Sequence, residues 1–240
     1  GVAPGIPNFL LGYWNSKMKI NSFDYCVGGL PKNPSPPHNY KAPFSPIDVI
    51  EEYTRPARMR INSQVVTKPA LSDLEILNFS EVGKLEAFNT DGLRSLLQTM
   101  SHIPNMKEKT LRYPGHAKLI QSMIDDGLFN NKNFDKTINR LFEDWKLKED
   151  EPEFTILDIN IYSDSKNIHY HLYDETDDIL KSSSMARTTG FTATATINML
   201  LNNLWSKKGV FPPELVGENE RCIDFLLSYL SARNVTMSQN

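Results

Sequence analysis

The predicted strands of this chain occur in neighbouring runs, and this order constrains the fold more than any other feature of the sequence. Runs rich in β-branched and aromatic residues are predicted as strands at 23–30, 59–61, 64–67, 83–88, from 107, 154–162 and 168–173. The last two flank Ser163-Asp164-Ser165 and predict a hairpin. Regular alternation of strand and helix would indicate a parallel sheet, and it is missing here. The pattern predicts an α+β domain, with a mixed or antiparallel sheet covered by helices.

Apolar residues at helical spacing predict the covering helices. The predicted helices are 4–18, 46–55, 134–148, 184–205 and 218–232. Asn89-Thr90-Asp91 resembles a cap for one more helix, with Leu93, Leu96, Leu97 and Met100 facing inward. An acidic loop is predicted over 148–153.

Residues 107–127 combine a strand, a Pro-Gly turn and a helix that Gly127 closes. Alternation places Glu108, Thr110 and Arg112 on one face of the strand. Arg112, Tyr113 and His116 would then cluster at a strand-to-helix corner, where an anionic ligand can bind. A capped connection with a surface arginine is the alternative.

Composition excludes several classes of function. The formal net charge of -3 gives no broad basic surface for nucleic acid. No apolar run reaches the roughly 20 residues of a membrane span. Cys26 and Cys222 lie far apart and form no zinc motif, which fits a reducing cytoplasm.

His169 and His171 share a strand face, but only Asp158 and Asp174 lie near them in sequence. A half-exposed sheet face is therefore favoured over a metal site, and no metal is expected.

Arginines recur at the ends of predicted elements, where pockets form. Arg55, Arg94, Arg112 and Arg187 could pair in bidentate fashion with ligand carboxylates. Surface ion pairs are the alternative for each of them. Tyr113 and His116 are the nearby titratable side chains and are the candidates for a general acid or base.

No cofactor motif is visible in the sequence. Gly28-Gly29 ends a predicted strand, yet no GxGxxG opens a helix, and a P-loop and a GxSxG elbow are also missing. The chain itself is therefore expected to bind no cofactor, and a stand-alone hydrolase or metalloenzyme has little support.

Six phrases, in order along the chain, resemble the saccharopine dehydrogenase / saccharopine reductase family, specifically its C-terminal, substrate-side domain. They are Gly1–Gly5 with Asn8, Val27–Pro31, Phe44–Pro46, Glu86–Asp91, Thr110–His116 and Gly209–Glu214. The chain lacks an initial Met and is interpreted as part of a longer bacterial relative, without its Rossmann domain.

The resemblance implies an oxidoreductase in lysine-type amino-acid metabolism that acts on the C–N bond of a carboxylated secondary amine. NAD or NADP would bind the missing N-terminal Rossmann domain, and the isolated chain would be inactive. Gly1, Val2, Pro4 and Gly5 would lie near the cofactor. Arg55, Asn89, Arg94, Arg112 and Arg187 would bind a small carboxylated amine or amino acid.

The resemblance also implies the organisation of the parent protein. Residues 19–183 would form the sheet domain, similar to the second domain of glyceraldehyde-3-phosphate-dehydrogenase-like folds. Segments 1–18 and 184–240 would pack on the missing domain. A homodimer in the cytoplasm is expected, with no nucleic-acid or membrane partner.

The sequence departs from the fungal members of the family at three places. Ile47 stands where they have an arginine, Thr90 stands where they have the arginine of an Asn-Arg-Asp phrase, and Thr54 occupies another arginine position, next to Arg55. Two alternatives stay open. One is a carboxynorspermidine-type polyamine dehydrogenase domain, and the other is a non-catalytic binding or scaffold domain.

Overall fold

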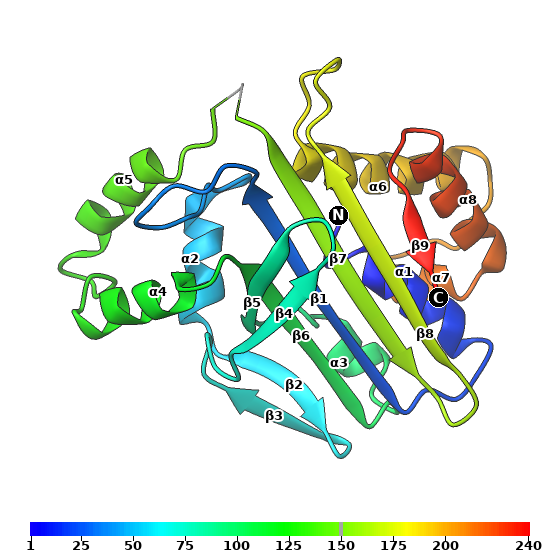
Figure 1. Cartoon of the computed structure of the whole chain (residues 1–240). Coiled ribbons are helices and arrows are strands. Elements are labelled where there is room, and N and C mark those ends of the chain that lie inside the picture. Colours follow the sequence, from blue (N-terminus) through cyan, green and yellow to red (C-terminus); the bar gives the residue numbers. More distant parts are fainter. Residues whose placement is uncertain (149–150) are drawn as a thin grey trace.

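The centre of the fold is a pair of parallel strands, β1 (Ser22–Pro31) and β6 (Asn105–Arg112), in register from Ser22 opposite Asn105 to Val27 opposite Thr110. In the computed structural model, which describes residues 1–148 and 151–240, every other pairing between named strands is antiparallel (Figure 1). The strand order is β3-β2-β6-β1-β7-β8-β9, with β5 also on β6 and β4 on β5. The predicted mixed sheet and α+β character are confirmed.

The predicted strands are all present. The remaining strands are β2 (Ala57–Ile61), β3 (Gln64–Lys68), β4 (Glu75–Phe79), β5 (Gly83–Asn89), β7 (Glu153–Tyr162), β8 (Asn167–Glu175) and β9 (Met237–Gln239). The predicted hairpin is β7–β8, paired from Phe154 opposite Glu175 to Tyr162 opposite Asn167. Strands β4 and β9 were not predicted, because β4 is largely exposed and β9 has only three residues.

The helices agree with the sequence except in two places: the helix predicted after Asp91 was wrong, and the short helix that begins at Pro213 was not predicted. They are α1 (Ile6–Asn15), α2 (Pro46–Thr54), α3 (Leu96–Thr99), α4 (His116–Asp125), α5 (Phe134–Asp144), α6 (Ser184–Leu201), α7 (Pro213–Gly217) and α8 (Glu220–Ser231). The helix predicted directly after Asp91 was wrong: α3 has four residues and begins only at Leu96. Arg94 has φ of 49°, a left-handed conformation that interrupts a right-handed helix. Residues 149–150 of the predicted acidic loop lie outside the described residues.

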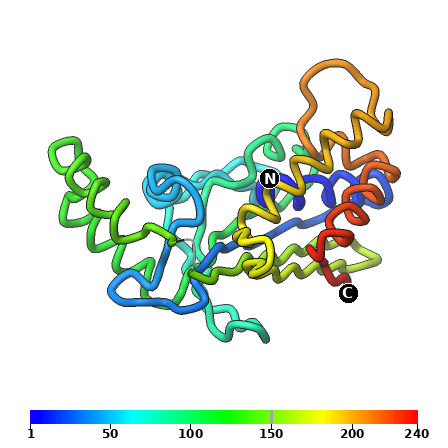
Figure 2. The backbone as a smooth tube through the Cα atoms, turned by 90° about the horizontal axis from the view of Figure 1, so that it is seen from above, coloured from blue at the N-terminus to red at the C-terminus, as the bar shows by residue number. Residues whose placement is uncertain are grey.

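Two apolar cores lie at different parts of the sheet. The larger one joins one sheet face, through residues such as Phe23 and Ile159, to α1, α3, α6 and α8. Figure 2 shows α1, α6 and α8 together on one side of the sheet. The second core surrounds the buried Trp145, where α2, α4 and α5 meet near the end of β1. The two terminal segments, 1–18 and 184–240, therefore pack on the chain's own sheet.

The helices α1 and α7 approach each other at backbone distance. A Cβ atom on Gly12 would lie 1.9 Å from the carbonyl oxygen of Glu214, and one on Gly217 would lie 2.1 Å from that of Phe9. The Glu214 side chain is fully buried and accepts hydrogen bonds from Asn8 Nδ2 at 3.0 Å and Thr99 Oγ1 at 2.6 Å. Gly12 and Gly217 thus allow α1 and α7 to pack closely, and the Glu214 carboxylate links α7 to Asn8 of α1. In the described part of the chain, no helix has the length and apolar character needed to cross a bilayer.

Candidate functional site

A cavity of about 670 Å³ lies between the two cores, beside the carboxyl-terminal halves of β1 and β6. Its lining includes the N-terminal residues 1–4, the strand residues 27–29, residues 43–44, one side of α2 with Arg55, Arg94, and the first turns of α6. Thr110 and Arg112 of β6 form part of its wall. A concave site with several polar groups of opposite charge is suited to binding a small molecule.

The glycine pair of β1 allows close packing at the cavity. A Cβ atom on Gly29 would lie 2.5 Å from Met185 Cε, and one on Gly28 would lie 2.9 Å from Leu111 Cβ. Contacts under about 3 Å between carbon atoms are repulsive. Glycine at position 29 therefore lets Met185 of α6 come close to the strand, and glycine at position 28 makes room for Leu111 of β6.

Arg112 is the most buried cation of the site, with 3% exposure. Its guanidinium donates Nε to the Tyr53 hydroxyl at 2.9 Å and Nη2 to Glu52 Oε2 at 3.0 Å, and it lies 4.4 Å from the centre of the Tyr40 ring. Its burial contradicts the alternative of a surface arginine at this corner. Burial raises the pKa of the Glu52 carboxyl, against the opposing effect of Arg112.

His116 lies beneath this arginine and does not line the cavity. Its Nδ1 is 2.8 Å from the carbonyl oxygen of His38, which can only accept, so Nδ1 carries the proton. Its Nε2 therefore accepts from the Tyr53 hydroxyl at 3.0 Å. Burial, together with the nearby Arg112, lowers the pKa of His116 to about 3. His116 is thus neutral at physiological pH and holds Tyr53 in place for Arg112.

Three arginines surround the buried carboxylate of Asp91. Arg58 Nη2 lies 2.8 Å from Oδ2, Arg55 Nε 3.6 Å and Arg94 Nη1 3.9 Å. Burial opposes ionisation of Asp91, but the bonds from Arg58 outweigh it and hold its pKa below the ordinary value. Arg55 and Arg94 of this cluster line the cavity, and Arg55 also pairs with Glu51 at 3.1 Å.

The structure brings together some of the predicted site residues and not others. Arg55, Arg94 and Arg112 line one cavity with Gly1, Val2 and Pro4. Gly5 lies directly behind them, where an added Cβ would be 1.8 Å from the Gly1 carbonyl oxygen.

The other predicted residues lie elsewhere. Asn89 Nδ2 binds Asp73 Oδ2 at 2.9 Å, and Tyr113 donates its hydroxyl to the Pro31 carbonyl at 2.9 Å. Arg187 is buried in a cluster with Asp174 and Asp177, where Nη1 lies 2.8 Å from Asp177 Oδ2.

The acidic residues of the site were not predicted from the sequence. Asp48, Glu51 and Glu52 line the same cavity as the arginines, and Glu51 and Glu52 form ion pairs with Arg55 and Arg112. Glu108 lies behind its wall, bound by Thr90 and by the backbone N–H of Gly92, and burial raises its pKa to about 8. The strand alternation already placed Glu108 on the face of Arg112, and that pattern could have identified it.

A second buried acid lies under the start of α6. Glu153 Oε1 accepts the backbone N–H of Met185 at 3.0 Å. Burial raises the pKa of Glu153 to about 7. Because Met185 lines the cavity, this carboxyl fixes the helix end that forms one wall.

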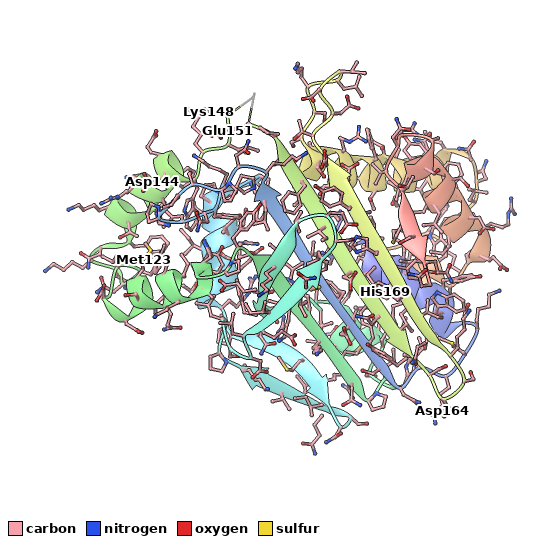
Figure 3. The ribbon with its side chains drawn as sticks, viewed as in Figure 1. Met123, Asp144, Lys148, Glu151, Asp164 and His169 are labelled. Carbon is pink, nitrogen blue, oxygen red and sulfur yellow. The ribbon has the colours of Figure 1, made fainter. Side chains whose placement is uncertain are left out.

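The predicted histidine pair, His169 and His171, lies on the sheet face that points away from the larger core. Figure 3 labels His169 on β8. His169 Nε2 and His171 Nδ1 lie 2.8 and 2.9 Å from the same oxygen, Asp158 Oδ1, and His171 Nε2 also lies 3.2 Å from Glu81 Oε1. Across the residues that the structure describes, no cluster of three or more His, Cys, Asp or Glu side chains has a geometry suited to a metal ion. Both histidines instead belong to a half-buried polar network.

Comparisons with known proteins agree with this architecture. The family model described as Saccharopine dehydrogenase C-terminal domain matches residues 1–235. Among solved structures, the chain is similar to apo histidine-tagged saccharopine dehydrogenase (L-Glu forming) from Saccharomyces cerevisiae, with a TM-score of 0.72 and 15% sequence identity. The match covers 95% of this chain and 68% of that one. At this identity, the structural match shows the fold alone.

Proposed function

Because the chain belongs to the saccharopine dehydrogenase C-terminal domain family, we propose that its cavity binds a small ligand that carries both carboxylate and amine groups. The observation that supports this most is the charge pattern of the wall: Arg55, Arg94 and Arg112 line the same cavity as Asp48, Glu51 and Glu52. Guanidinium groups bind carboxylates, and carboxylates bind ammonium groups. A carboxylated secondary amine has both.

In the full-length protein, this domain would serve as the substrate side of an NAD(P)-dependent oxidoreductase acting on a C–N bond. Family membership implies an N-terminal domain partner. When bound, a nicotinamide supplies hydride transfer. Val2, Pro4 and Met185 are apolar residues of the cavity lining and would be suited to contact with such a ring.

The proposal extends to the surroundings of the cavity. The outer side of α6 exposes Ile197, Leu200 and Leu201, which are suited to contact with the N-terminal domain. A homodimer, a cytoplasmic location and a likeness to the second domain of glyceraldehyde-3-phosphate-dehydrogenase-like folds stay predictions.

Two alternatives have specific support. The three acids in the cavity favour a more cationic substrate, such as a carboxylated polyamine. The existing ion pairs of Arg112 with Glu52 and of Arg55 with Glu51 favour a non-catalytic scaffold, because these arginines already have partners.

Calorimetric titration of the 240-residue chain with glutarate tests the proposal. Arg112→Ala should weaken binding by about 2–5 kcal/mol, the usual cost of truncating one partner of a buried charge pair. Arg140→Ala is the matched control, because Arg140 is 83% exposed on α5. Equal affinity in both variants would contradict the assignment of the cavity, and no binding by the wild type would favour the scaffold. NADPH should not bind the isolated chain.

A further inference from the structure

Glu108 is a buried acid whose bonds come from neutral groups. It is 4% exposed, and its Oε2 lies 2.7 Å from Thr90 Oγ1 and 3.0 Å from the backbone nitrogen of Gly92. Buried carboxyl groups are ordinarily paired with a cation or hold a proton. The surroundings of Glu108 thus favour its protonated form.

The glycine at position 92 leaves space for the Glu108 carboxyl. A Cβ atom on Gly92 would lie 2.5 Å from both Cδ and Oε2 of Glu108. The Tyr25 hydroxyl donates to the Gly92 carbonyl at 2.9 Å and holds the glycine in place. The carboxyl therefore has one defined position, next to the Thr90 hydroxyl.

A chain of hydroxyl groups connects Glu108 to the cavity. Thr90 Oγ1 lies 2.8 Å from Thr110 Oγ1, and both threonines are 4% exposed. Thr110 lines the cavity. The carboxyl and the two hydroxyl groups thus follow one another at hydrogen-bond distance, and the second hydroxyl belongs to a residue that lines the cavity.

The protonation state of Glu108 sets the direction of this chain, because each threonine has one hydroxyl proton. When Glu108 is protonated, it can donate to Thr90, Thr90 donates to Thr110, and Thr110 is free to donate into the cavity. When Glu108 is ionised, Thr110 donates to Thr90 and Thr90 donates to the carboxylate. Thr110 then offers the cavity only lone pairs.

We propose that Glu108 stores the proton that the cavity exchanges with the amine nitrogen of its ligand, through Thr90 and Thr110. This rests on the proposed function, since it requires an amine in the cavity. In delivery, the Glu108 O–H bond breaks, each threonine accepts one proton and passes on its own, and an N–H bond forms on the ligand. Glu108 is left as a carboxylate, and the reverse sequence reprotonates it.

The charged surroundings are consistent with reversible exchange. Burial is the main cause that raises the pKa of Glu108 to about 8, and the negative charges of Glu52 and Asp91 act in the same direction. The Tyr25 hydroxyl on β1 is near enough to interact with Glu108 and with Arg94, which lies on the loop after β5: burial and the charge of Glu108 raise the pKa of Tyr25, and Arg94 opposes them. An acid with a pKa near the working pH can both give and take a proton.

Infrared spectroscopy of the full 240-residue chain tests the proton store without a ligand. Difference spectra between about pH 6 and about pH 10, on either side of the pKa of about 8, should show a carboxylic-acid band that Glu108→Gln removes. On transfer to D₂O, the band should shift about tenfold more slowly in Thr110→Val than in the wild type, because the route to the cavity is cut and exchange must wait for local opening. A missing band, or equal exchange rates, overturns the proposal.

Calorimetry with iminodiacetate, a small carboxylated secondary amine, tests the coupling to a ligand. Titrations near pH 8 in buffers of different ionisation enthalpy count the protons exchanged on binding. The wild type should exchange a fraction of a proton, and Glu108→Gln should bind without that exchange. Equal proton exchange in the two proteins refutes the relay. Failure of the wild type to bind refutes the proposed function, and the infrared result then decides on the proton store alone.

Discussion

Replacing Glu153 by glutamine should change how the stability of the domain depends on pH. Glu153 is 1% exposed, one of its oxygens accepts the N–H of Met185, and Oε2 has no partner in the described part of the chain. Burial raises its pKa from 4.5 to about 7. The folded protein thus holds a proton that the unfolded chain releases between these two values.

The sign and size of the effect follow from this difference. Stability from Glu153 is fully present below pH 4.5, declines as pH rises, and is lost above about pH 7. At about 1.4 kcal/mol per pH unit, the total is about 3 kcal/mol. Glutamine can accept the same N–H bond but does not titrate. The unfolding free energy of Glu153→Gln minus that of the wild type should therefore rise by about 3 kcal/mol over this window.

Urea unfolding at a series of pH values measures this difference, in which the titration of all other groups cancels. Glu175→Gln is the control, because hydrogen bonds from Lys32 and Tyr173 lower the pKa of the half-buried Glu175. The unfolding free energy of Glu175→Gln minus that of the wild type should therefore fall with rising pH. A difference for Glu153→Gln that stays constant or falls with rising pH would refute the reasoning.

Three further substitutions test the packing of the site and the core. Arg112→Met should lower the unfolding free energy by about 3 kcal/mol, because it leaves Glu52 without its cation, as measured by urea unfolding. Gly92→Ala should cost about 2 kcal/mol in the same assay, since the new methyl group would overlap the Glu108 carboxyl; unchanged stability would contradict this position of the carboxyl. Gly12→Ala should lower the free energy by about 3 kcal/mol through separation of α1 and α7, whereas Gly190→Ala, which meets nothing within 4 Å, should have almost no effect.

Local patterns predicted the elements of this fold well where one face is buried. Alternation along β6 correctly separated Thr110 and Arg112 from Leu111, and the β7–β8 hairpin formed around the predicted turn. Gly127, with φ of 69°, follows α4 as expected. The parallel pairing of β1 with β6 could not be predicted in this way, since strands so far apart in sequence carry no local indication of their partner.

The candidate site was predicted in part. Arginines at the ends of helices and strands can be recognised in a sequence, but their acidic partners cannot. Arg187 was expected to bind the same ligand as Arg112, and in the structure Asp174 and Asp177 hold it in a separate buried cluster. Asn89 is likewise held by Ser72 and Asp73. The partner of each of these side chains depends on which carboxylate the tertiary structure brings close to it, and sequence spacing does not contain that information.

The contact between α1 and α7 also determines when this protein can finish folding during its synthesis. Asn8 and its partner Glu214 are 206 residues apart, so α1 leaves the ribosome long before its binding surface exists. Until then, Ile6, Phe9 and Leu10 lack the neighbours that bury them in the finished core. A nascent chain halted before Glu214 would keep this apolar helix face open to chaperones, and release of the last helices would act as the step that completes the domain.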